Sequence, residues 1–283
     1  MSESQKFLRP LKENEKGFHF VVSDIETVNW TKFQLIGFYD GLKYFSFRTM
    51  REYIDFIYRK KNKNDGNLVI YMHNGGKFDF NFVIEALAEK GLRYSLVCIG
   101  SRIAQVRVPI TKKFSIIFRD SVCILPAKLE KLAKDFNVKS QKLTGNIDFE
   151  TEQFDLKNPK HLQYAEADHK ALFEVLCAYF SQEKIRKSGF ALTTASQTMK
   201  IFRTHFLKHP VKCTSQDVQD FCREGFFGGR VEIFKREGKG LKYYDVNSLY
   251  PFCMKKTLPL EWICGTQNVF DFGFHEEIGR AHV

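Results

Sequence analysis

Two carboxylates one residue apart, Asp24 and Glu26, stand inside a run of β-forming residues, Phe18–Val28. Side chains at positions i and i+2 of a strand point to the same face, so the sequence predicts that these two acids project together. Two anions held side by side on a half-buried strand repel each other unless a cation lies between them. The pair indicates either a solvated strand end or half of a divalent-metal site, and by itself the solvated end is the simpler interpretation.

The rest of the pattern predicts an α/β fold, with a mixed sheet and helices on both of its sides. Asp40-Gly41 between two aromatic-rich runs is typical of a hairpin, and Gly91 is expected to end a helix. The expected strands are 18–27, 33–39, 43–47, 67–72, 92–98, 103–109 and 114–118, with a further pair at 230–234 and 241–246. The expected helices are 50–61, 78–90, 127–136, 160–184, 192–208 and 216–223.

A third acid, Asp79, follows a buried strand and the turn Gly75-Gly76. Ligand sites in α/β sheets gather beyond strand ends, so this position suits a metal ligand. The alternative is that Asp79 stabilises the N-terminus of the following helix, which is a common arrangement.

The fourth acid, Asp168, belongs to the apolar stripe of a long helix. That stripe consists of Tyr164, Asp168, Leu172, Val175 or Leu176, and Tyr179. A carboxylate on a core-facing stripe is unfavourable unless it is paired or bound to metal. The alternative is a hydrogen-bonded buried acid that Lys128 or Arg119 reaches. Glu166 and His169 lie off the stripe and are expected to be solvated.

The four acids together suit two Mg²⁺ or Mn²⁺ ions. Such a pair supports in-line attack of water on a phosphodiester. We expect Tyr164, one turn before Asp168, to orient the attacking water rather than to bind metal.

The composition favours a polyanionic partner. The chain has 44 Lys and Arg residues against 33 Asp and Glu residues, a formal net charge of +11. Its seven cysteines include no C-x-x-C pair, so zinc knuckles and disulfide frameworks are not expected. We expect a soluble intracellular protein without a membrane span, because no targeting segment or long apolar run is present.

A second chemical motif is Tyr244–Pro251, Y-D-V-N-S-L-Y-P. The pattern predicts a strand that ends at Asp245 and a turn into a helix, where backbone amides are placed to receive a triphosphate. An acid at an ordinary strand-to-helix turn is the alternative.

The first set of motifs resembles the three exonuclease motifs of proofreading DNA polymerases. They are D-x-E at Asp24–Glu26, N-x-x-x-F-D at Asn74–Asp79 and Y-x-x-x-D at Tyr164–Asp168. The resemblance implies a ribonuclease-H-like fold and 3′→5′ excision. It also implies that single-stranded DNA contacts Thr27, Asn74, Phe78 and Ser121. Val122 departs from the family's Leu, and Thr144 stands where the family has Lys, with Lys142 two residues early.

The second motif resembles motif A of family B DNA polymerases, D-x-x-S-L-Y-P. The resemblance implies that Asp245 binds the catalytic metals, that Ser248, Leu249 and Tyr250 contact the nucleotide, and that Tyr250 excludes ribose. Phe226–Gly229 resembles the Y-x-G-G linker, with Gly228 and Gly229 as DNA contacts. Together the motifs resemble the protein-primed branch, which implies a terminal priming protein and residence in a host cytoplasm or, for a linear-plasmid enzyme, a mitochondrion.

We therefore expect a fragment of a replicative DNA polymerase that is competent as an exonuclease but not as a polymerase. The later strings K-x-x-x-N-S-x-Y-G and Y-x-D-T-D do not occur in it. The expected divisions are a polar lead-in at 1–17, an exonuclease domain at 18–188, an incomplete palm with its linker at 189–276, and a tail at 277–283. That tail matches the translation of a sequencing adapter. A stand-alone exonuclease and, less simply, a non-catalytic single-strand-binding module remain the alternatives.

Overall fold

The computed structural model describes residues 6–14, 17–29, 31–60, 66–140, 154–155, 157–227, 232, 236–242 and 244–256. The chain divides into two compact units, Pro10–Lys208 and a second unit of Met1–Arg9 with His209–Val283. The larger unit holds the seven-stranded sheet and most of the described helices.

The larger unit is built on a mixed sheet. Its strands are β2 (Phe20–Val28), β3 (Lys32–Tyr39), β4 (Tyr44–Phe47), β5 (Leu68–Met72), β6 (Ser95–Ile99), β7 (Arg102–Pro109) and β8 (Ser115–Asp120). They lie in the order β4-β3-β2-β5-β8-β7-β6. The pairs β2–β5 and β5–β8 are parallel and the other neighbours are antiparallel. The predicted mixed α/β architecture is thereby confirmed.

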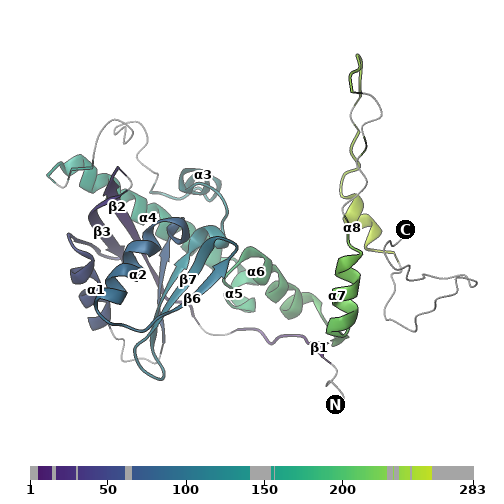
Figure 1. Cartoon of the computed structure of the whole chain (residues 1–283), viewed down its shortest axis with the longest axis horizontal. Helices are drawn as coiled ribbons and strands as arrows, with labels where there is room; N and C mark the ends of the chain where they lie inside the picture. The colour runs from purple at the N-terminus through teal and green to yellow at the C-terminus, as the bar shows by residue number, and fades with distance from the viewer. Residues whose placement is uncertain are drawn as a thin grey trace, which may run out of the picture. The chain divides into compact units, whose positions relative to one another are not determined.

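Helices flank this sheet (Figure 1). They are α1 (Met50–Arg59), η1 (Gly75–Lys77), α2 (Asp79–Glu89), η2 (Ser121–Cys123), α3 (Leu129–Asp135), α4 (Pro159–Ser181), α5 (Glu183–Ser188), α6 (Thr194–Ile201) and the π-helical η3 (Phe202–Phe206). The segment expected as one helix at 160–184 breaks at Gln182, whose ψ of 126° is extended. The helix expected at 192–208 changes to a π-helix at Phe202.

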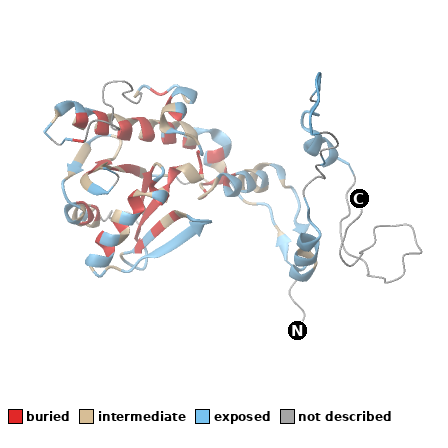
Figure 2. Cartoon of the chain, turned by 45° about the horizontal axis from the view of Figure 1, so that its top comes forward, coloured by how far each residue is buried: buried red, intermediate tan, exposed pale blue. Residues whose placement is uncertain are grey.

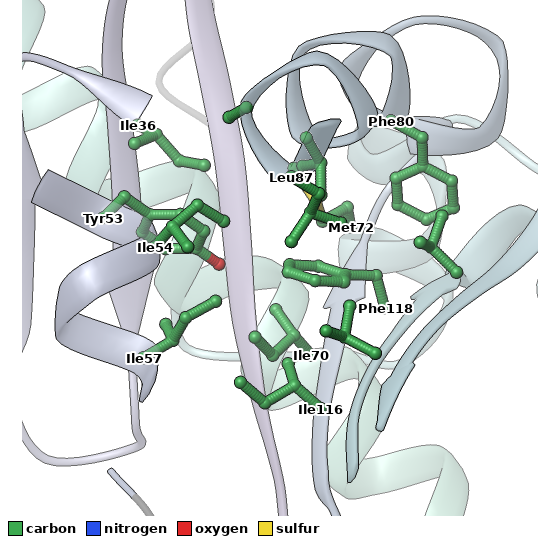
Figure 3. Close-up of a cluster of buried hydrophobic side chains, with 14 of the residues drawn as sticks. Ile36, Tyr53, Ile54, Ile57, Ile70, Met72, Phe80, Leu87, Ile116 and Phe118 are labelled. Atoms are coloured by element: carbon green, nitrogen blue, oxygen red, sulfur yellow. The ribbon is translucent and has the colours of Figure 1, made fainter. Parts of the chain in front are cut away.

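Each face of the sheet has its own apolar core. Residues of α1 and α2 pack against one face, where Ile54 and Leu87 approach Ile70 and Phe118 of the strands (Figure 3). Residues of α3, α4 and α5 pack against the opposite face, where the strands contribute Val22, Val69, Tyr71 and Ile117. Alternation along each strand supplies both cores, because successive side chains point to opposite faces.

The predicted hairpin is present. β3 and β4 pair antiparallel around Gly41, whose φ of +92° is readily adopted only by glycine. Asp40 Oδ1 accepts hydrogen bonds from the backbone N–H groups of Leu42 and Lys43. Gly91, with φ +64°, follows the last residues of α2 as expected for a helix end.

In the second unit, β1 (Phe7–Leu8) pairs antiparallel with β9 (Val211–Lys212), and two helices follow, α7 (Gln216–Glu224) and α8 (Leu249–Cys253). Both helices are exposed, whereas the buried residues gather in the sheet and helices of the larger unit (Figure 2). The prediction of a strand at 241–246 is wrong for its described residues, which are in no strand. Leu241 and Tyr244 are about four-fifths exposed, so no apolar face stabilises a strand there. Of the expected partner strand only Glu232 is described.

Candidate functional site

β2 presents Asp24 and Glu26 on the face that α4 covers. Val22 packs with residues of α4, whereas Val21 and Ile25 pack with α1 and α2. Alternation therefore places Asp24 and Glu26 on the Val22 face, where both are half-buried. The β2–β3 register shifts between Glu26 and Thr27, a β-bulge of the kind that often adjoins active sites.

Asp79 reaches β2 from the start of α2. The chain leaves β5 through Asn74, in the left-handed region at φ +64°, and the one-turn helix η1. Parallel pairing of β2 with β5 ends at Val22, so the edge of β2 beyond that residue is open to other donors and acceptors. The Ile25 backbone N–H donates to the Asp79 carboxylate, between the two acids of β2. Burial, with a smaller contribution from the charge of Asp120, raises the pKa of Asp79 to about 7.

α4 brings Tyr164 and Asp168 to the same sheet. Both side chains are buried, as their place on the apolar stripe requires, and α4 packs on β2 and β3. Arg119, one expected partner of a buried Asp168, instead donates to Gln105 and lies 3.5 Å from the Tyr71 hydroxyl.

The position of His169 contradicts one expectation from the helical pattern. The prediction that this side chain is solvated is wrong, because His169 is 1% exposed and lies against β3. The predicted stripe is a single line of side chains along α4. The helix contacts both β2 and β3, so a side chain beside the stripe is buried as well. Glu166 is partly exposed and forms an ion pair with Lys170 at 2.7 Å.

The charge around this end of the sheet is negative. The pKa of Tyr44 on β4 is raised by burial and by the charges of Glu26, Asp24 and Glu166, so all three acids influence one hydroxyl. Repulsion among carboxylates of this kind is relieved by protonation or by a cation.

The donor set suits a hard divalent ion in its chemistry, because Asp24, Glu26, Asp79 and Asp168 supply only carboxylate oxygens. In the part of the chain that the structure describes, no three His, Cys, Asp or Glu side chains are placed to hold a metal ion. Asp79 is turned toward the Ile25 N–H. Metal binding by these four acids therefore requires their carboxylates to turn toward one another.

A buried acid that the sequence did not single out organises the loop before Asp79. Asp120 is fully buried at the end of β8, where its Oδ2 accepts from the Gly76 N–H at 3.1 Å and from Arg102. Its Oδ1 accepts from the Val122 N–H at 3.0 Å. Arg102 also donates to Asn74 Oδ1 at 3.0 Å. The signal in the sequence was weak: Asp120 is the last residue of a strand whose central residues, Ile116–Phe118, are apolar.

Three of the expected DNA contacts, Asn74, Phe78 and Ser121, lie around the same loop. Asn74 is exposed and Phe78 is half-buried, with its ring 5.4 Å from the ring of Phe82. Ser121 is buried, and its hydroxyl lies 2.9 Å from His73 Nδ1. Thr27 is half-buried beside the β2 bulge. Lys142 and Thr144 lie outside the described residues.

The motif-A residues belong to the second unit. Asp245 is exposed, and Ser248 has φ +57° immediately before α8 begins at Leu249. Tyr250 is 79% exposed on the first turn of that helix. Gly228 and Gly229 lie outside the described residues. In the described part of the chain, no helix is long and apolar enough to span a membrane.

Comparisons with known proteins agree with the family that the motifs resemble. The family model of DNA polymerase type B, organellar and viral, matches residues 61–158 and 157–263. A DNA-directed DNA polymerase of Enterobacteria phage PRD1 is 31% identical over 66% of this chain and 30% of its own length. A probable DNA polymerase of Ascobolus immersus is 27% identical over 69% of this chain and 20% of its own length.

The fold has a counterpart of known structure. Phi29 DNA polymerase, solved with primer-template DNA and incoming nucleotides, superimposes with a TM-score of 0.61 over 76% of this chain and 40% of its own, at 19% identity. The chain spans less than half the length of each of these relatives. Because the family model covers most of the chain, the chain belongs to the organellar and viral type B DNA polymerases.

Proposed function

We propose that the larger unit is a metal-dependent 3′→5′ exonuclease that removes nucleotides from single-stranded DNA ends. The observation that carries this proposal is the bond from the Ile25 N–H to the Asp79 carboxylate. It joins Asp79 to the strand segment between Asp24 and Glu26, and α4 packs on the same strand with Asp168 buried. Acids from three elements thus converge on β2.

The four acids would hold two divalent ions, which when bound activate water and stabilise the leaving 3′-oxygen. Tyr164 lies one helical turn before Asp168, from where its hydroxyl would orient the attacking water. Because the pKa of Asp79 is raised to about 7, this carboxyl would release its proton near neutral pH when it binds a metal ion.

The DNA end would be held by the loop between β5 and α2. Arg102 donates to Asn74 Oδ1, which leaves the amide N–H groups of Asn74 to donate to an acceptor on the nucleic acid. Phe78 offers a ring edge or face to a base, and Thr27 offers a hydroxyl. The Ser121 hydroxyl is buried against His73, so a contact with DNA would require it to be uncovered. Phi29 DNA polymerase, whose fold this chain shares, was solved in complex with primer-template DNA, which supports DNA as the ligand.

The test is nuclease activity of Asp24→Ala/Glu26→Ala on a labelled single-stranded oligonucleotide with Mg²⁺ or Mn²⁺. Wild-type protein should shorten the oligonucleotide from its 3′ end, and the double variant should bind the oligonucleotide without shortening it. Unchanged cleavage by the double variant would refute the site. Binding without cleavage by the wild-type protein would favour the single-strand-binding alternative.

For the second unit we propose a role in nucleotide binding within a longer, protein-primed polymerase. Asp245 would be a metal ligand, Ser248 and Leu249 would contact the triphosphate, and Tyr250 would exclude ribose. A priming protein is the partner that this type of polymerase implies.

The 283-residue chain by itself should not extend a primer, because a two-metal polymerase site needs carboxylates besides Asp245. Primer extension by the purified chain, measured with all four nucleotides and Mg²⁺, would contradict this expectation.

A further inference from the structure

We propose that His169 is a positioning residue that holds Asp168 at its place over β2 by filling a notch in β3 at Gly37. The inference rests on the proposed exonuclease function, and it concerns a side chain outside the expected set of metal ligands and DNA contacts.

The notch exists because residue 37 has no side chain. A methyl group at Gly37 would lie 2.4 Å from both Cε1 and Nε2 of His169, and 2.8 Å from the Tyr44 hydroxyl. Such distances are far below van der Waals contact, so the imidazole occupies the volume that a side chain would take. Gly37 is also the residue of β3 that pairs with Asp24 of β2. The notch therefore lies beside one of the proposed metal ligands.

The ring is held on its other sides as well. His169 Nδ1 donates to the Ala165 carbonyl oxygen of the preceding turn at 2.6 Å. The Tyr44 ring meets the imidazole edge-on at a centroid distance of 5.1 Å. Contacts from β3, β4 and α4 itself thus give this side chain a single orientation.

His169 is the next residue after Asp168, so the notch determines where the Asp168 backbone lies relative to β2. Mg²⁺ requires near-ideal octahedral geometry with oxygen distances of about 2.0–2.1 Å. A displacement of α4 by about 1 Å would disrupt a metal site, whose ligands must stay within about 0.5 Å of their productive positions. Loss of the contact at Gly37 is therefore expected to lower metal affinity.

A second contact of the same kind provides the control. One turn further along α4, Phe173 lies against Gly41, where a methyl group would be 2.5 Å from the ring. Phe173 also packs with Phe20 and Tyr39, at centroid distances of 5.1 and 5.3 Å. It attaches α4 to the sheet as His169 does, but no proposed metal ligand adjoins it.

The experiment compares wild-type protein with His169→Ala, Gly37→Ala, the double variant and Phe173→Leu. Calorimetry measures the affinity for Mn²⁺. The affinity for single-stranded DNA is measured in the presence of EDTA, and stability is measured by urea unfolding. His169→Ala should weaken Mn²⁺ binding by about tenfold or more, the effect of losing an outer-shell partner, with single-strand affinity unchanged. Gly37→Ala tests the same contact from the strand side. Its effect should be smaller in the double variant, where the imidazole is gone and only the Tyr44 hydroxyl remains close to the added methyl.

Phe173→Leu should lower the urea midpoint while its Mn²⁺ affinity stays at the wild-type value. Wild-type Mn²⁺ affinity in His169→Ala, or an equal loss in Phe173→Leu, would overturn the inference and leave the proposed nuclease intact. Absence of Mn²⁺ binding and cleavage in the wild-type protein would refute the proposed function, and this inference with it.

Discussion

At the scale of single residues, the two buried acids Asp79 and Asp120 differ in what surrounds them. Asp120 accepts from two backbone N–H groups and from Arg102, which satisfies its charge. Asp79 accepts from the Ile25 N–H but lies in the field of the Asp120 charge, and burial above all raises its pKa to about 7. Asp120 is therefore a structural acid, whereas the charge of Asp79 has fewer partners, which suits the proposed role as a metal ligand.

The first prediction concerns the pH dependence of stability without metal. Between pH 4 and 7 the folded protein keeps a proton on Asp79 that the unfolded chain has released, so the free energy of unfolding falls as pH rises. Asp79→Asn removes this loss of stability at high pH, because the amide does not titrate. In EDTA the variant should exceed the wild-type protein in stability at pH 8, by on the order of a few kcal/mol, and the gap should close toward pH 4. Urea unfolding of both proteins at pH 4 and pH 8 measures this difference in stability. A difference that does not change with pH would contradict the raised pKa of Asp79.

The second prediction concerns Asp120. Asp120→Ala leaves Arg102 and the N–H groups of Gly76 and Val122 without their acceptor, which should cost about 3–5 kcal/mol in the free energy of unfolding. Asp135→Ala, which removes an exposed ion pair with Lys131, is the matched control and should cost less than about 1 kcal/mol. Similar losses in the two variants would show that the hydrogen bonds of Asp120 contribute little to stability.

At the scale of elements, the site depends on how tightly the loop between β5 and α2 lies against β7. A methyl group at Gly76 would be 1.9 Å from the Ile103 carbonyl oxygen and 2.8 Å from Asp120 Oδ2. The loop approaches the strand so closely that only glycine fits, and this approach sets where α2 begins and where Asp79 lies.

The third prediction follows from that contact. Gly76→Ala should destabilise the protein by about 1–3 kcal/mol and reduce nuclease activity, because the loop and Asp79 must move. Gly91→Ala is the control. A methyl group there would meet no atom within 4 Å, but the residue has φ +64°, so the substitution introduces only backbone strain of about 1 kcal/mol. It should leave nuclease activity unchanged. Equal activities in the two variants would argue against a role for the close approach.

At the scale of the whole molecule, the compact unit continues to Lys208. Thr194 Oγ1 donates to the Ile124 carbonyl oxygen at 2.8 Å, and Gln197 is buried, with its side chain bonded to Ala191, Ser188 and Gly189. α6 is thus part of the larger unit, whose last residue is Lys208. The division at residue 188 stays a prediction about functional domains.

The fourth prediction is that residues 10–208 fold without the remainder. A fragment ending at Lys208 should unfold cooperatively, with a midpoint within a few degrees of the full chain. A fragment ending at residue 188 loses Gln197 and Thr194, so it should be less stable by several kcal/mol. Circular dichroism melts of both fragments measure the difference, and equal midpoints would place the limit of the stable unit at residue 188.

Much of the fold was predictable because its signals are local. Runs of apolar and aromatic residues predicted β3, β5 and β7 to within a residue or two, and helical periodicity predicted α1 and α2. The strand at 241–246 was wrong since a strand also needs a neighbour and a buried face. The break at Gln182 and the π-helix at Phe202 left no clear mark in the residue pattern.

For the site, the sequence by itself determined that Asp24 and Glu26 share a face and that Asp168 is buried, because the periods of strand and helix are properties of the backbone. Only the tertiary structure decided that Asp79 meets the Ile25 N–H, that Asp120 and Arg102 support the loop, and that His169 fills the notch at Gly37. Those contacts join residues 18 to 132 positions apart in the chain. No local pattern specifies them, since they arise when the sheet brings distant segments together.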